Sequence, residues 1–254
     1  MTWSPGQYLR FAGPRLRPAA DLLARVPLDV PGRVFDLGCG TGATTALLAA
    51  RFPGARITGI DSSGEMLAAA RAEHPGLSFE EHDIAAFSPS APADLVFSNA
   101  ALQWLPGHER LMPTLMGCVK GGGVLAVQVP RVEASPRIAV LRELAGDPCW
   151  RDRLVPLLFP GALDPAAYYG LLAPLAAAVD IWETEYLHVL EGDNPVVEWS
   201  VGSAAAPLVA ALNEEERTEF LARYRARMGA AYPRRPDGRT LLPFRRLFLV
   251  AVRN

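Results

Sequence analysis

Short apolar runs alternate with amphipathic segments through the first half of the chain. The apolar runs predict strands at Val34–Leu37, Arg56–Ile60, Leu77–Glu80, Asp94–Ser98 and Val124–Val129. The amphipathic segments predict helices at Thr44–Arg51, Met66–Ala72 and Leu111–Cys118. This alternation is typical of an α/β fold whose parallel sheet is covered by helices on both faces. Ligands of such folds bind at the carboxyl ends of the strands.

The pattern changes on either side of this core. An amphipathic run at Ala19–Val26 predicts a helical arm, and residues 131–178 combine several prolines with short helical patterns. Further predictions are a strand at 180–190, helices within 195–230 with Asn213 as an N-cap, and a closing strand at 247–252. We therefore expect one domain over residues 1–254. It comprises an arm (1–33), a core (34–130), and a cap with closing strands (131–254).

The segment from Val34 to Gly42 joins a buried strand to a glycine-rich turn, V-F-D-L-G-C-G-T-G. Gly38, Gly40 and Gly42 can take positive φ angles and let a ligand approach the backbone closely. The helix predicted after the turn offers free N–H groups to a negatively charged ligand group. The spacing G-x-G-x-G differs from the dinucleotide fingerprint G-x-G-x-x-G, which makes a dinucleotide enzyme a weak alternative.

Polar residues follow three further predicted strands. Asp61 ends the second strand, where an acidic side chain can accept hydrogen bonds from ribose hydroxyls. Asp83 follows the third strand and can accept a hydrogen bond from an exocyclic amine, and Asn99 follows the fourth. A single Asp at a strand end is more often a turn former or a helix cap. The whole series, in order, favours a cofactor site.

Composition narrows the function classes. The chain of 254 residues is 50% hydrophobic, enough for a sizeable core, and its net charge of −2 argues against a general nucleic-acid binder. Its three cysteines form no C-x-x-C pair, so we expect no metal site and no disulfide framework, but reduced thiols in the cytoplasm. The start of the chain lacks the apolar core of a signal peptide. The apolar stretch Ala166–Val179 is too short and interrupted to span a membrane.

The motif D-L-G-C-G-T-G, together with Asp61, Asp83 and the later N-A-A-L-Q-W, resembles the class I S-adenosylmethionine-dependent methyltransferases. The resemblance implies a Rossmann-like, doubly wound, seven-stranded sheet and S-adenosylmethionine as the methyl donor. In that family the glycine turn passes under the methionine part of the cofactor, and the two acids hold the ribose diol and the adenine amine. Carried over, the cofactor-binding residues are Asp36, Gly38, Gly40, Gly42, Asp61, Ser62, Met66, Asp83, Ile84, Asn99 and Ala100.

A closer resemblance covers nearly the whole chain. The stretches W-S-P-G-Q-Y-L-R-F, A-L-Q-W-L-P, V-D-I-W-E-T and F-R-R-L-F-L-V-A-V are similar to the trans-aconitate methyltransferases. Those enzymes methylate one carboxylate of a tricarboxylic acid, so the resemblance implies a small carboxylic acid as the substrate. A carboxylate is already ionised at neutral pH, so we expect a positioning mechanism without a catalytic dyad. We expect the substrate to be bound by Tyr8, Arg17, Gln103, Trp104, Trp199, Tyr224 and Arg246.

One position departs from the family pattern. Relatives resemble one another around a G-x-L-R-P stretch, whereas this chain reads W-S-V-G-S-A-A-A-P, with Ala206 where an arginine is expected. Arginine can bind a carboxylate through two hydrogen bonds and alanine cannot, so the acid and the carboxylate that is methylated stay open. The oligomeric state stays open as well.

Three other functions remain as alternatives. One is methylation of a malonyl group on a carrier protein. This function needs a basic surface on which the carrier protein docks, and the sequence contains no run of basic residues that would form one. Another is a natural-product methyltransferase, in which His108 is the best candidate for a base. The third is a methyltransferase fold that binds the cofactor without catalysis, against which the intact glycine turn, Asp61 and Asp83 argue.

Overall fold

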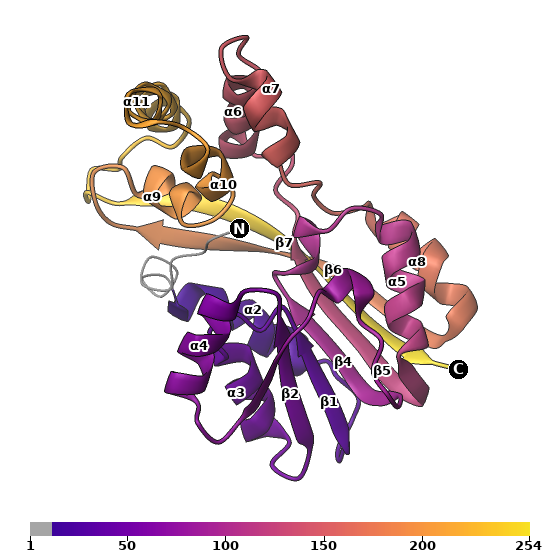
Figure 1. The fold of residues 1–254 in the computed structure, drawn as a ribbon. Helices are drawn as coiled ribbons and strands as arrows, with labels where there is room; N and C mark the ends of the chain where they lie inside the picture. The colour runs from indigo at the N-terminus through magenta and orange to yellow at the C-terminus, as the bar shows by residue number, and fades with distance from the viewer. Residues whose placement is uncertain (1–11) are drawn as a thin grey trace.

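The computed structural model describes residues 12–254, which form one mixed sheet with helices on both faces and a helical cap at one end (Figure 1). The sheet has seven strands in the order β3-β2-β1-β4-β5-β7-β6. The strands are β1 (Arg33–Leu37), β2 (Arg56–Asp61), β3 (Ser78–Glu81), β4 (Ala93–Asn99), β5 (Val119–Pro130), β6 (Ala176–Leu190) and β7 (Thr240–Arg253). The predicted doubly wound α/β fold is confirmed.

The first five strands pair in parallel, as predicted, but β7 runs antiparallel to both β5 and β6. β7 pairs with β5 from Val252 to Arg246, and it then continues alone with β6 as far as Thr240. The closing strand is therefore much longer than the predicted residues 247–252. It forms a two-stranded ribbon that projects past the carboxyl end of β5, and this ribbon supports the cap.

Helices cover the two faces of the sheet because alternate strand residues point to opposite sides. Leu95 and Phe97 pack under α2 (Ala12–Leu23) and α3 (Ala43–Arg51), whereas Val96 packs under α5 (His108–Gly117) and α8 (Pro165–Leu172). The helix α4 (Gly64–Glu73) packs against β2 and β3. Within residues 12–254 no helix has the length and apolarity needed to cross a membrane.

The cap has an apolar core of its own, centred on Trp150, Trp199 and Phe220. Phe244 of the projecting part of β7 belongs to the same core, which joins the cap to the sheet. The cap helices are α6 (Pro136–Ala145), α7 (Arg151–Leu154), α9 (Pro195–Val201), α10 (Ala206–Ala210) and α11 (Glu214–Ala231). The short 3-10 helices of the described residues are η1 (Ile84–Ala86), η2 (Leu102–Trp104), η3 (Val155–Leu157) and η4 (Ala173–Leu175).

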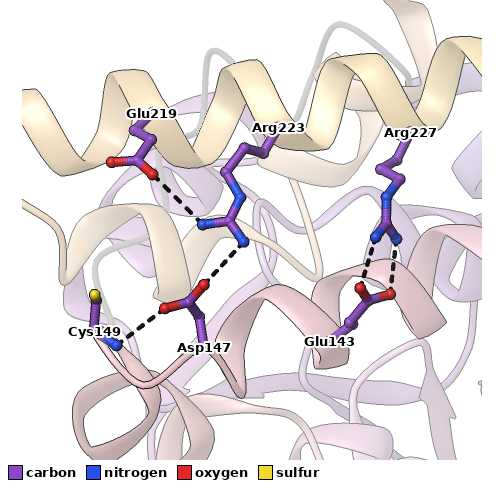
Figure 2. Close-up of polar contacts among 6 residues, drawn as sticks. All are labelled: Glu143, Asp147, Cys149, Glu219, Arg223 and Arg227. Carbon is purple, nitrogen blue, oxygen red and sulfur yellow. Dashed lines mark hydrogen bonds and ion pairs between the residues drawn. The ribbon is translucent and has the colours of Figure 1, made fainter.

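Ion pairs fasten α11 to α6 and to the turn after it (Figure 2). Arg227 donates two hydrogen bonds to Glu143, at 2.7 and 2.6 Å, and Arg223 bonds to Asp147 at 2.9 Å. The predicted cap at the start of α11 is confirmed, because Asn213 forms a reciprocal capping box with the third residue of the helix. These contacts fix the position of α6, which contributes to the site described next.

Candidate active site

The glycine turn between β1 and α3 has the left-handed backbone that its sequence predicts. The φ angles of Gly38, Gly40 and Gly42 are 75°, 55° and 85°. A Cβ at Gly38 would lie 2.1 Å from the Cβ of Ala101, whereas one at Gly40 would meet nothing within 4 Å. Gly38 is therefore required by packing, and Gly40 leaves open space above the turn. Gly42 faces away, against the ring of Phe79, and begins α3.

Asp36 lies beneath the turn, with 1% of its surface exposed. Its Oδ2 accepts a hydrogen bond from Thr45 Oγ1 at 2.7 Å, which links β1 to the first turn of α3. Burial, with a smaller contribution from the charge of Asp61, raises the pKa of Asp36 to about 7 against the lowering effect of this bond. The side chain thus supports the turn from inside.

A cavity of about 420 Å³ opens above the turn, at the carboxyl ends of β1, β2 and β4. On its wall, Asp61 accepts hydrogen bonds from the N–H groups of Gly40 and Ser63, both at 2.9 Å. We call this space the cofactor cavity. It is lined by Gly38, Gly40, Asp61, Ser62, Ser63, Met66, Asp83, Ile84, Ala100, Ala101, Trp104 and Leu105.

The structure brings most of the predicted cofactor residues together in this cavity. The exceptions are Asp36 and Gly42, which lie behind the turn, and Asn99, whose neighbour Ala100 forms the wall. Ala100 has a φ of 55°, a strained value for a residue with a Cβ, and its N–H donates to Gln128 O at 2.9 Å. This bend at the end of β4 turns the chain from the sheet into η2.

A second cavity, of about 90 Å³, shares Ala100 and Trp104 with the first and extends under the cap. We call it the inner cavity. Its wall is mainly apolar and aromatic, but it includes two arginines that are almost fully buried. It is lined by Ala100, Gln103, Trp104, Pro130, Val132, Arg137, Phe159, Trp199, Gly202, Ser203, Ala204, Phe244 and Arg246.

The two arginines come from different parts of the fold. Arg246 projects from β7, is 3% exposed, and donates to Gln128 Oε1 at 3.2 Å. Arg137 projects from α6 and is 2% exposed. Their guanidinium carbons lie 4.5 and 4.9 Å from the ring centroid of Phe244. Because both guanidinium carbons lie so close to the same ring, the distance between them cannot exceed the sum of their two distances from the ring centroid.

Gln103 adds an oriented amide to the inner cavity. Its Nε2 donates to Ala100 O at 2.7 Å, and this fixes which end of the amide is the oxygen. The Oε1 atom is buried and has no hydrogen-bond partner among the residues that the structure describes. Buried polar atoms are nearly always hydrogen-bonded, so a donor from a bound molecule fits this position.

The other predicted substrate residues are divided by the structure. Trp104 and Trp199 line the inner cavity, but Tyr224 lies behind it, fully buried, with its hydroxyl 2.9 Å from Ser200 Oγ and 3.3 Å from Arg137 O. Arg17 lies on α2, has 71% of its side chain exposed, and lines neither cavity. Tyr8 lies outside the described residues.

His108 is unsuited to act as a base. It lies at the start of α5, is 3% exposed, and lines neither cavity. Its Nε2 is 2.8 Å from Leu102 O, so this nitrogen carries the proton, and its Nδ1 accepts from Tyr168 Oη at 2.5 Å. Both ring nitrogens are used within the fold, which removes the reason to propose base catalysis by this residue.

Sequence reasoning missed Arg137. The residue stands in the proline-rich stretch after β5, where no motif distinguishes it from an exposed arginine. Only the packing of α6 brings it to the inner cavity. Ala206, in contrast, begins α10 and does not line the cavity, although the preceding residues 202–204 do.

Comparison with known proteins decides the family. Residues 34–123 match the model of a methyltransferase domain. The chain is 48% identical to the trans-aconitate 2-methyltransferase of Azoarcus sp. (strain BH72), over 99% of both chains, and 48% identical to that of Methylobacterium nodulans, over 99% of this chain and 98% of the relative. The chain belongs to the trans-aconitate 2-methyltransferase family. It is therefore an S-adenosylmethionine-dependent methyltransferase.

Solved structures agree on the fold. The YcgJ protein of Bacillus subtilis matches with a TM-score of 0.61 at 10% identity, over 94% of this chain and 98% of that one. A putative methyltransferase of Bacillus halodurans matches with a TM-score of 0.60 at 14% identity, over 93% and 98%. At such low identity these matches support the architecture alone.

The cofactor cavity offers S-adenosylmethionine open space on the glycine turn and carboxylate acceptors for its hydroxyl and amine groups. The open space at Gly40 lets a ligand lie directly on the turn. Asp61 has one backbone N–H on each carboxylate oxygen, and each oxygen keeps a further lone pair for a ribose hydroxyl. The Oδ1 of Asp83 accepts from Ala85 N at 2.9 Å, which orients this carboxylate at the start of η1.

Proposed function

We propose that this protein transfers a methyl group from S-adenosylmethionine to one carboxylate of trans-aconitate, or of a similar small polycarboxylic acid, and forms a methyl ester. The names of the full-length relatives support this substrate. The observation that carries the proposal is the buried guanidinium of Arg246 in the inner cavity, which shares Ala100 and Trp104 with the cofactor cavity. Arginine is the side chain best suited to bind a carboxylate.

We assign the cofactor cavity to the methyl donor. In this assignment Asp61 binds the ribose hydroxyls, Asp83 and Ile84 meet the adenine, and Met66 lies against the adenosine. Gly38 and Gly40 pass under the methionine part, while Asp36 supports the turn from below. When bound, S-adenosylmethionine supplies a methyl group on a positively charged sulfur, and S-adenosylhomocysteine is left after transfer.

We assign the inner cavity to the acid. Carboxylic acids have pKa values of about 4, so the reacting oxygen is already a nucleophile at neutral pH and no proton has to be removed. The work of the protein is then to hold this oxygen in line with the methyl group and to exclude water. Arg246 holds a carboxylate, and Trp104 forms the wall between the two cavities. We also propose that the reaction takes place in the cytoplasm, where free thiols such as those of Cys39, Cys118 and Cys149 stay reduced.

The test is transfer of labelled methyl groups to trans-aconitate and to a panel of di- and tricarboxylic acids. We expect a base-labile methyl ester, with Arg246→Met raising KM for the acid by about 10- to 100-fold, the loss of a charged hydrogen bond. Arg17→Met is the matched control, since Arg17 lines neither cavity, and we expect its KM to match that of the wild type. Failure of the wild type to methylate any acid of the panel would disprove the proposed activity.

A further inference from the structure

The second buried arginine of the inner cavity, Arg137, has no role in the activity as stated so far. It is carried by α6 of the cap, whereas Arg246 is carried by β7 of the sheet. Both guanidinium groups lie against the ring of Phe244. Two positive charges therefore lie at one small cavity, one carried by the cap and the other by the sheet.

The rest of the cavity favours a ligand with an apolar middle and charged ends. Trp104, Phe159 and Trp199 contribute aromatic surface to the same cavity as the two cations. The planar guanidinium of arginine presents paired N–H donors that match the two oxygens of a carboxylate. A ligand with two carboxylates separated by a short carbon chain therefore suits two guanidinium groups and the apolar surface of the same cavity.

The backbone under Arg137 is held firmly. Its carbonyl oxygen faces the hydroxyl of Tyr224 at 3.3 Å, and that hydroxyl also bonds to Ser200 of α9. The ion pairs of Figure 2 fasten the outer side of the same helix to α11. Tyr224, which the sequence suggested as a substrate ligand, instead positions the helix turn from which Arg137 projects. A side chain whose backbone is held in place in this way can distinguish ligands by their geometry.

We propose that Arg137 binds a second carboxylate of the acid, one that is not methylated, and thereby makes the protein select acids with at least two carboxylates. The inference rests on the proposed function and extends it to the origin of substrate selection. Arg246 holds the acid from the sheet side, and Arg137 holds it from the cap side. The spacing between the two then decides which acids lie with a carboxylate oxygen at the methyl group.

The test uses three acids that differ by single carboxylates: trans-aconitate with three, trans-glutaconate with two, and crotonate with one. For Arg137→Met we expect kcat/KM with trans-aconitate to fall about 10- to 100-fold, and kcat/KM with crotonate to stay unchanged. Arg137→Lys keeps the positive charge but not the planar guanidinium, so kcat/KM with trans-aconitate should fall less than in Arg137→Met. Arg142→Met, on the same helix but outside the cavity, is the control, and S-adenosylhomocysteine affinity should be unchanged in all three variants.

Equal losses on all three acids would overturn the inference, because they would show that Arg137 serves the fold or the reaction and not the second carboxylate. Calorimetric titration of trans-aconitate into the protein saturated with S-adenosylhomocysteine separates this result from failure of the proposed function. Binding that weakens in Arg137→Met, without methyl transfer by the wild type, would support the anion site and disprove the activity. Equal affinity of wild type and Arg137→Met would overturn the inference whatever the activity.

Discussion

Substitution of Asp36 by Asn should change how stability depends on pH. The pKa of Asp36 rises from 3.8 to about 7 on folding, mainly through burial. Between these values the unfolded chain loses the proton while the folded chain keeps it, so the free energy of unfolding falls as pH rises. A shift of about 3 pH units corresponds to about 4 kcal/mol, all of which is lost once the pH exceeds the folded pKa.

The asparagine of the Asp36→Asn variant would resemble the protonated Asp and keep an acceptor for Thr45, yet it has no proton to lose. The difference in unfolding free energy between Asp36→Asn and wild type should therefore grow in favour of the variant, by about 4 kcal/mol, from pH 4 to pH 8. Urea unfolding of both proteins at several pH values measures this difference. The contributions of the other ionisable groups are the same in both proteins and therefore cancel. Thr45→Val removes the bond that lowers the pKa and should shift the transition to higher pH. A difference that stays constant with pH would refute the reasoning.

Three further predictions concern Gly38 in the glycine turn, Asp61 in the cofactor cavity and His108. Gly38→Ala places a Cβ 2.1 Å from that of Ala101 at a φ of 75°, so urea unfolding should show a loss of about 2 kcal/mol or more, and wild-type stability would contradict the packing argument. Asp61→Ala should weaken S-adenosylhomocysteine binding about 10- to 100-fold by calorimetry, with no change in fold by circular dichroism. His108→Gln should leave the pH profile of kcat unchanged and cost about 1 to 3 kcal/mol of stability, because it disturbs the bond to Tyr168; a lost basic limb in that profile would restore base catalysis.

The lining of the cofactor cavity was predictable because its residues are local to the strand ends. Gly38, Gly40, Asp61 and Asp83 each stand within a few positions of a strand that apolar patterning identifies. Parallel strands bring their carboxyl ends to one edge of the sheet, so position along the chain becomes position in space. Which side of the turn each residue faces was not predictable. Gly42 shares the motif but packs beneath it, because its direction depends on the φ and ψ angles of the whole turn.

The lining of the inner cavity was predictable only in part because it depends on long-range packing. Gln103 and Trp104 lie four and five residues after the end of β4, and both line the inner cavity as the sequence predicts a pocket there. Arg137 and Phe159 reach the inner cavity through cap segments whose sequence pattern is weak and whose positions are set by the core of the cap. Tyr224 was expected in the pocket, yet its fully buried ring faces the helix behind it. Side-chain direction on a helix cannot be derived without knowing what the helix packs against.

Ala206 does not conflict with the proposed binding of a carboxylate in the inner cavity. The wall at this corner of the inner cavity is formed by residues 202–204, and Ala206 lies after them, at the start of α10. The cationic groups of the cavity are placed elsewhere, by β7 and α6, and both are buried against Phe244. Two guanidinium groups can engage two carboxylates of a tricarboxylic acid while a third is methylated and becomes neutral. Under the proposals above, an alanine at position 206 therefore leaves both arginines of the inner cavity in place, and we expect the preferred acid to depend on the spacing of Arg137 and Arg246.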